Sequence, residues 1–197
     1  MTSIYRQIGI GCEHLFREIL IDTTQYKDRD FAHWSYDTKT SGGKVKTLSL
    51  DGRLELNEIQ NAKLKQRLQD WIAAYCKEIS VKKAPKNGIV FEVRQGYKSK
   101  DSKRQNADID NATVAWANSY LPVFAIFSSQ IDSDIVLRYR NHRCGIMIGS
   151  TSTNSNISLF AFSKNVLGYD LVGFFEKNSK KFKVEINSVL KTLLDAS

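Results

Sequence analysis

Apolar and polar positions follow two periodicities along the chain, one typical of helices and one typical of strands. Apolar residues three and four positions apart predict helices over residues 4–21, 57–76, 131–140 and 184–194, and another that begins near Ser102. Short runs of β-branched and apolar residues predict strands over 89–95, 121–127 and 145–149. The run LPVFAIF at 121–127 is apolar throughout, which is typical of a strand covered on both faces.

Turn signals between these elements predict two hairpins. Residues 44–50 alternate between apolar and polar, Asp51-Gly52 is a two-residue turn signal, and residues 53–56 would form the returning strand. A second hairpin would join 79–83 to 89–95 through a turn at 85–88. The polar and aromatic stretch 23–43 is interpreted as an ordered loop.

The order of these elements predicts an α/β or α+β protein with a mixed central sheet flanked by helices. The length of 197 residues and the hydrophobic content of 42% are those of a single domain, so we expect one domain over residues 1–197. Walker or Rossmann glycine loops and a G-x-S-x-G elbow are absent from the sequence, which argues against NTPases, dinucleotide enzymes and serine hydrolases.

The cysteine content and the net charge indicate the cellular compartment and the class of binding partner. The three cysteines are odd in number and widely spaced, which favours a reducing compartment, and we expect the protein to be cytoplasmic. No apolar run reaches the roughly 20 residues that cross a bilayer, so no membrane association is expected. The net charge of +8 indicates a polyanionic partner.

Most of this charge lies in one window that also contains acidic residues. Residues 77–104 hold nine basic and three acidic side chains, a net +6. Glu92 lies inside a predicted strand and Glu78 opens the predicted partner strand, so a hairpin would bring both carboxylates to one edge. Because two adjacent carboxylates repel each other unless a cation lies between them, this pair predicts a Mg²⁺ site and phosphodiester hydrolysis.

The run FEVRQGYKSKDSKRQNADI resembles the active-site strand and following helix of type II restriction endonucleases in the PD-(D/E)XK nuclease superfamily. The triplet Glu92-Val93-Arg94 matches the acid-x-Lys of that strand. Ser99, Lys103 and Gln105 match a polar stretch found in several members. The run LPVFAIF resembles the core strand that follows the active-site helix, and the resemblance covers about residues 77–129.

The resemblance implies a Mg²⁺-dependent endonuclease that cleaves double-stranded DNA at a short specific sequence and acts as a homodimer. Its catalytic core would span about residues 44–149. The implied catalytic set is Glu78, Glu92 and Arg94, with Glu78 and Glu92 binding the metal. The implied DNA-binding residues near the site are Lys98, Ser99, Lys103, Arg104 and Gln105.

Two positions depart from the family pattern. Glu78 replaces an aspartate, so Asp51 or Asp70 is an alternative upstream metal ligand. Arg94 replaces the lysine, and because arginine stays protonated it cannot act as a neutral amine. Lys98 is then an alternative source of that function.

Other features leave further alternatives open. Arg138, Arg140 and Arg143 form a second basic cluster suited to phosphates or base edges. Glu13 and Glu18 on the first helix are either accessory carboxylates or surface residues. The whole basic region could belong to a non-catalytic nucleic-acid-binding module, or to a repair or recombination nuclease of the same superfamily. A dependence on Mg²⁺ would separate the nucleases from the binding module.

Overall fold

A computed structural model describes residues 4–39, 43–97 and 101–195. The helices are α1 (Ile4–Thr24), α2 (Ala62–Glu78), α3 (Ser102–Ala117), α4 (Ser133–Asn141), α5 (Leu159–Phe162) and α6 (Leu171–Asp195), with short helical turns η1 (Arg29–Ala32) and η2 (Ser163–Leu167). The strands are β1 (Trp34–Lys39), β2 (Val45–Leu50), β3 (Gly52–Glu55), β4 (Gly88–Arg94), β5 (Tyr120–Ile126) and β6 (Gly145–Ile148).

The central sheet has the strand order β3-β4-β5-β6. β3 runs antiparallel to β4, and β4, β5 and β6 are parallel to one another. The register places Gly52 opposite Phe91, Phe91 opposite Val123, and Val123 opposite Gly145. The helices α3 and α4 make the crossovers between the parallel strands, so the mixed sheet flanked by helices confirms the predicted fold class.

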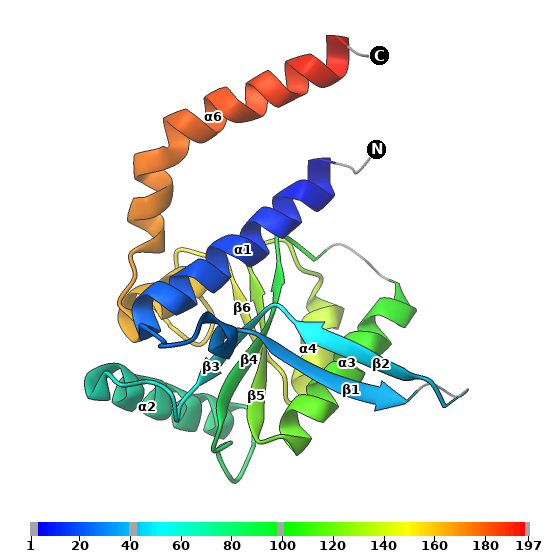
Figure 1. Cartoon of the computed structure of the whole chain (residues 1–197), viewed down its shortest axis with the longest axis vertical. Coiled ribbons are helices and arrows are strands. Elements are labelled where there is room, and N and C mark those ends of the chain that lie inside the picture. The colour runs from blue at the N-terminus through cyan, green and yellow to red at the C-terminus, as the bar shows by residue number, and fades with distance from the viewer. Residues whose placement is uncertain (1–3, 40–42, 98–100, 196–197) are drawn as a thin grey trace.

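Helices cover both faces of this sheet (Figure 1). On one face, α1 and α2 pack on the sheet through a large cluster that includes Phe16, Leu68 and Phe91. On the other face, α3 and α4 pack through a second cluster that includes Phe124 and Tyr139. Because successive strand residues point to opposite faces, Phe91 and Val93 face α1, while Glu92 and Arg94 face α3.

Local sequence signals explain where two of these helices begin. The side chain of Asn61 accepts a hydrogen bond from the Leu64 amide at 3.1 Å and caps α2. The side chain of Asp101 accepts one from the Lys103 amide at 2.9 Å and caps α3. The start of α3 near Ser102 is therefore confirmed.

The predicted loop over residues 23–43 is wrong in part, because residues 34–39 form β1. This strand pairs antiparallel with β2, with Trp34 opposite Leu50. Trp34 is buried against Tyr120 of the central sheet, with ring centroids 5.9 Å apart. A buried aromatic residue therefore anchors a strand whose remaining residues are mostly polar.

The predicted first hairpin is also wrong, because Asp51-Gly52 does not reverse the chain. Instead, β2 leaves the β1–β2 hairpin and continues through Asp51 into β3, which pairs with β4. The glycine is needed for packing, since a Cβ at Gly52 would lie 3.0 Å from a methyl carbon of Leu20 on α1. A sequence typical of a tight turn here joins two sheets.

The predicted strand over residues 79–83 is absent from the structure. The helix α2 continues to Glu78, and the Val81 amide then donates to the Cys76 carbonyl at 2.7 Å, closing the helix end. In the C-terminal part, α6 begins at Leu171, earlier than the predicted start at 184. None of the helices in the described part of the chain combines the length and apolar character needed to cross a bilayer.

Candidate active site

Asp51 lies at the junction of β2 and β3, beside the strand that carries Glu92. Its amide donates to the Phe91 carbonyl at 2.9 Å, and its Oδ2 accepts a hydrogen bond from the Val93 amide at 2.7 Å. These two bonds bracket Glu92, so Asp51 lies next to it across the strand pair. Arg17 of α1 donates from Nε to the Asp51 carbonyl at 2.9 Å, which ties α1 to the junction.

Burial makes both carboxyl groups harder to ionise. Burial raises the pKa of Asp51 to about 6, against the hydrogen bond from Val93, and the charge of Glu13 raises it further. Burial raises the pKa of Glu92 to about 8, against the attraction of Arg94, and the charges of Asp51 and Asp108 add to the rise. Two neighbouring acids that resist ionisation form a place where an added cation would be stabilised.

Arg94 supplies the positive charge that is present at this place. Its Nη2 forms ion pairs with Glu92 and, at 3.1 Å, with Asp108. Burial opposes the charge of Arg94, but the carboxylates of Glu92 and Asp108 raise its pKa overall. Within the described residues, the buried Nε of Arg94 has no hydrogen-bond partner. One donor of the guanidinium is therefore left for a further acceptor.

Asp108 on α3 is held by three donors. Its Oδ2 accepts hydrogen bonds from the hydroxyl of Tyr97 at 3.0 Å and from that of Tyr139 at 2.7 Å, and its Oδ1 accepts from Arg94. The two tyrosine hydroxyls are also 2.6 Å apart. Asp108 is only 5% exposed, so this carboxylate is fixed in the interior by groups from β4, α4 and the loop after β4.

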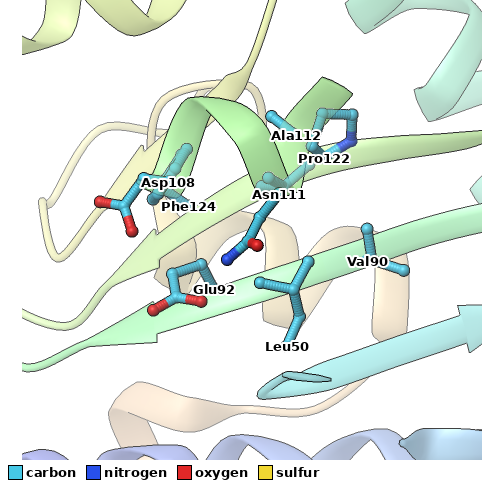
Figure 2. A pocket seen from close by; sticks show the side chains of 9 residues that line it. Leu50, Val90, Glu92, Asp108, Asn111, Ala112, Pro122 and Phe124 are labelled. Atoms are coloured by element: carbon cyan, nitrogen blue, oxygen red, sulfur yellow. The ribbon is translucent and has the colours of Figure 1, made fainter. Parts of the chain in front are cut away.

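Figure 2 shows the carboxylates of Glu92 and Asp108 on adjoining elements, with the amide of Asn111 beside them. These side chains line a small cavity of about 10 Å³, which apolar residues such as Leu50 and Val90 close on the other side. A cavity of this size is close to what one water molecule requires. One end of the cavity is therefore acidic and the opposite end is apolar.

A wider cleft of about 460 Å³ opens where β4 ends. Its walls come from the first half of α1, from residues 93–96 and from α3, and they include Arg6, Glu13, Arg94 and Arg104. Within the described residues, the buried Oε1 of Gln95 in this cleft has no hydrogen-bond partner. Besides Arg94, which is paired with Glu92 and Asp108, Arg6 and Arg104 line the cleft against Glu13, and this small basic excess suits an anionic ligand.

The predicted upstream ligand Glu78 and one of its two alternatives, Asp70, lie away from Glu92. Glu78 ends α2, where its Oε2 accepts a hydrogen bond from Asn156 at 2.8 Å and its Oε1 is 3.8 Å from Arg140. Asp70 is exposed on α2 and accepts a hydrogen bond from Gln66 at 2.8 Å. The charges that act on Glu92 include Asp51 and not Glu78. Of the three upstream acids considered, Asp51 is the one that the fold brings to Glu92.

The predicted DNA-binding residues have different surroundings. Lys98 and Ser99 lie outside the described residues. Lys103 and Arg104 are exposed in the first turn of α3. Gln105 is buried and accepts a hydrogen bond from Arg138 at 2.6 Å, so these two side chains join α3 to α4.

The other basic residues of the second cluster lie at the end of α4. Arg140 is close to Glu78, as described above, and Arg143 is exposed in the turn before β6 with a φ of 59°. Glu18 of α1 is ion-paired with Arg29, away from the Asp51 junction, whereas Glu13 lines the cleft. The basic first turn of α3 therefore adjoins the cleft more directly than the end of α4 does.

The carboxylates of Asp51 and Glu92 are candidate ligands for a metal ion. In the described ranges, no group of three or more His, Cys, Asp or Glu side chains is arranged to hold a metal. Mg²⁺ keeps several water ligands and is commonly held by one or two carboxylates together with substrate phosphate oxygens. Asp51 and Glu92 fit that ligand chemistry because both are carboxylates, and the charge of Asp51 acts on Glu92. The unpartnered Gln95 oxygen lines the wider cleft, whereas Glu92 lines the small cavity.

The sequence analysis did not identify Asp108, Tyr97 or Tyr139 as site residues. One signal was available for Asp108, because residues 105, 108 and 112 share the inward face of α3 and an acid at such a position needs a partner. The tyrosines carried no local signal, since their contact with Asp108 depends on the packing of α4. Comparisons of the chain with family models, curated proteins and solved structures find no match.

Proposed function

We propose that this protein is a Mg²⁺-dependent endonuclease that hydrolyses phosphodiester bonds of double-stranded DNA. The observation that carries the proposal is the position of Asp51, whose backbone and side chain bracket Glu92 on the adjacent antiparallel strand. The resemblance to the PD-(D/E)XK superfamily implies an upstream aspartate on the strand that precedes the acid-x-basic strand, and Asp51, although farther back in the sequence and separated by α2, lies at the start of the strand that pairs with β4. The helix α3 and the parallel strand β5 then follow in the expected order.

In this proposal, Asp51 and Glu92 hold the metal ion. Bound Mg²⁺ would polarise the scissile phosphate and lower the pKa of a bound water. Both carboxylates must be ionised to bind it, and the cation would offset the burial that raises their pKa values. The Asp51 carboxylate is held by the Val93 amide, so this one ligand is organised before metal arrives.

Arg94 would stabilise the negative charge that develops on the phosphate. Because it stays protonated, arginine cannot take a proton from the attacking water, so its contribution is electrostatic. Its Nε is buried and has no hydrogen-bond partner among the described residues. The charge of the cleft supports the same substrate, since Arg6 and Arg104 also line it.

The finer proposal is a type II restriction endonuclease that acts as a homodimer at a short specific sequence. It rests on the sequence resemblance, because the dimer and the recognition sequence follow from the family pattern. A repair or recombination nuclease of the same superfamily would share the chemistry but prefer branched, nicked or damaged DNA. The pattern of products separates the two.

Incubation of supercoiled plasmid with the purified protein and Mg²⁺ tests the proposal. We expect cleavage that requires the metal and is abolished by Asp51→Asn, which keeps an oxygen acceptor for the Val93 amide but removes the charge. Glu78→Gln is the matched control and should leave cleavage within about twofold of the original rate, because Glu78 lies outside the Asp51–Glu92 pair. Discrete fragments would support a restriction enzyme.

Two results would contradict the proposal. One is intact plasmid across a range of Mg²⁺ and Mn²⁺ concentrations while the protein still binds DNA, as a non-catalytic module would. The other is equal loss of cleavage in Asp51→Asn and Glu78→Gln, which would place the catalytic site elsewhere.

A further inference from the structure

The carboxylate of Asp108 is buried, ionically paired and outside the metal-ligand pair of the proposed function. It shares the Nη2 group of Arg94 with Glu92. A metal ion at Asp51 and Glu92 would compete with Arg94 for the same carboxylate of Glu92, because both are cations. A second anion that holds Arg94 would lower the free-energy cost of replacing Arg94 by the metal ion at the Glu92 carboxylate.

We propose that Asp108 is a positioning residue: clamped by the hydroxyls of Tyr97 and Tyr139, it keeps the Arg94 guanidinium in the site while Glu92 turns from Arg94 to a divalent cation. This inference rests on the proposed function, since it assumes that Glu92 is a metal ligand. It adds a role for three residues that the resemblance does not assign.

The geometry of the clamp supports a fixed anchor. The Tyr97 and Tyr139 hydroxyls both donate to Oδ2 of Asp108, at 3.0 and 2.7 Å, which leaves Oδ1 for Arg94. Tyr139 is fully buried and its ring stacks on Phe124 with centroids 4.4 Å apart. The clamp therefore comes from rigid packing between α4 and β5, and Asp108 has little freedom to follow Arg94 if the guanidinium moves.

The two anions that hold Arg94 differ in their access to the metal site. Glu92 lies on the strand beside Asp51, and the charge of Asp51 acts on it. Asp108 approaches from α3, and the tyrosines hold its Oδ2 independently of Arg94. When a cation binds Glu92, Arg94 can keep its bond to Asp108 and remain at the end of β4, beside the cleft that it lines.

Calcium affinity, measured by isothermal titration calorimetry on the full chain without DNA, tests this role. Ca²⁺ is the probe because it reports binding independently of cleavage. We expect Asp108→Asn to weaken Ca²⁺ binding about tenfold or more, as changes to groups that orient metal ligands typically do. Without Asp108, Arg94 would remain on Glu92 and compete with the metal.

A double-mutant cycle distinguishes positioning from simple charge. In an Arg94→Met background, Asp108→Asn should change Ca²⁺ affinity by less than about twofold, because the competing guanidinium is gone. Asp110→Asn is the matched control: it removes the same charge from an exposed position on α3 and should have little effect in either background. An equal loss from Asp108→Asn in both backgrounds would overturn the proposal, because Asp108 would then act only through its charge.

A second variant keeps the test decisive if Asp108→Asn folds poorly. Tyr139→Phe retains the Asp108 carboxylate and removes its 2.7 Å hydrogen bond, so it should weaken Ca²⁺ binding in the same direction by a smaller factor. Unchanged affinity in folded Asp108→Asn, or in Tyr139→Phe where Asp108→Asn does not fold, would overturn the inference and leave the nuclease proposal intact. An original protein that binds neither Ca²⁺ nor Mn²⁺ would overturn both.

Discussion

Replacing Glu92 by glutamine should stabilise the metal-free protein at high pH while abolishing cleavage. Burial raises the pKa of Glu92 from 4.5 to about 8 in the folded state. Because the folded-state pKa lies above the unfolded value, the stability conferred by the protonated carboxyl is complete below pH 4.5. It is lost progressively as the pH rises toward 8.

The size of the effect follows from that pKa difference. Each pKa unit corresponds to about 1.4 kcal/mol, so ionising Glu92 costs the folded state up to about 5 kcal/mol above pH 8. The Glu92 side chain is only 14% exposed, so solvent screens little of this cost. Glutamine resembles the protonated acid and avoids ionisation, so its advantage over Glu92 should grow between pH 4.5 and 8.

Urea denaturation in EDTA at pH 5 and pH 8.5 measures this advantage. We expect Glu92→Gln to be about as stable as the original protein at pH 5 and more stable by about 3–5 kcal/mol at pH 8.5. Glu176→Gln, at an exposed position on α6, is the matched control and should change stability by less than about 0.5 kcal/mol at either pH.

Adding Mg²⁺ at pH 8.5 should stabilise the original protein and leave Glu92→Gln unchanged, because a ligand stabilises the state that binds it. The reasoning is refuted if Glu92→Gln is no more stable than the original protein at pH 8.5. It is equally refuted if the gain is the same at both pH values, since the gain would then not arise from ionisation.

Three further predictions concern the backbone, Arg94 and salt. Gly88→Ala should lower the melting temperature markedly in differential scanning calorimetry, because φ at Gly88 is +136° and the added Cβ would lie 2.0 Å from the Leu54 carbonyl oxygen. Gly11→Ala should instead raise the stability by about 0.5–1 kcal/mol, because the added Cβ meets nothing within 4 Å and alanine favours the helix α1. Arg94→Met should slow plasmid cleavage at least about 100-fold, and Arg94→Lys should retain activity within about tenfold, because lysine keeps the charge; equal loss in both would exclude an electrostatic role. DNA affinity, measured by fluorescence anisotropy with Ca²⁺, should fall steeply between 50 and 200 mM salt if the cationic cleft contacts phosphates, and a flat response would rule those contacts out.

Helices and strands with strong local periodicity were predictable from the sequence, but the elements that they pair or pack with were not. The apolar run of β5 and the mixed β-branched run of β4 identified both strands, and the fold places them side by side. The turn signal Asp51-Gly52 was misinterpreted because the same residues suit a tight turn and a close approach to α1. The pairing of β3 with β4 spans all of α2, and no local pattern reports such a contact.

The same distinction between local and long-range information explains which candidate site residues could be predicted from the sequence. Glu92 and Arg94 lie on one strand, so a short motif was enough to select them. Glu78 was selected as the upstream acid because it is near Glu92 in the sequence, whereas Asp51 reaches Glu92 through long-range strand pairing. Asp108 likewise depends on how α3 and α4 pack on the sheet, which explains why the clamp emerged only from the structure.

The central claim is that Asp51 and Glu92 together hold a divalent cation. A crystal of the protein soaked in Mn²⁺ tests it directly, because the metal can be located by its anomalous scattering. We expect one strong anomalous peak between the carboxylates of Asp51 and Glu92, which is lost in Asp51→Asn. A peak at Glu78, or no peak near Glu92 at saturating Mn²⁺, would contradict it.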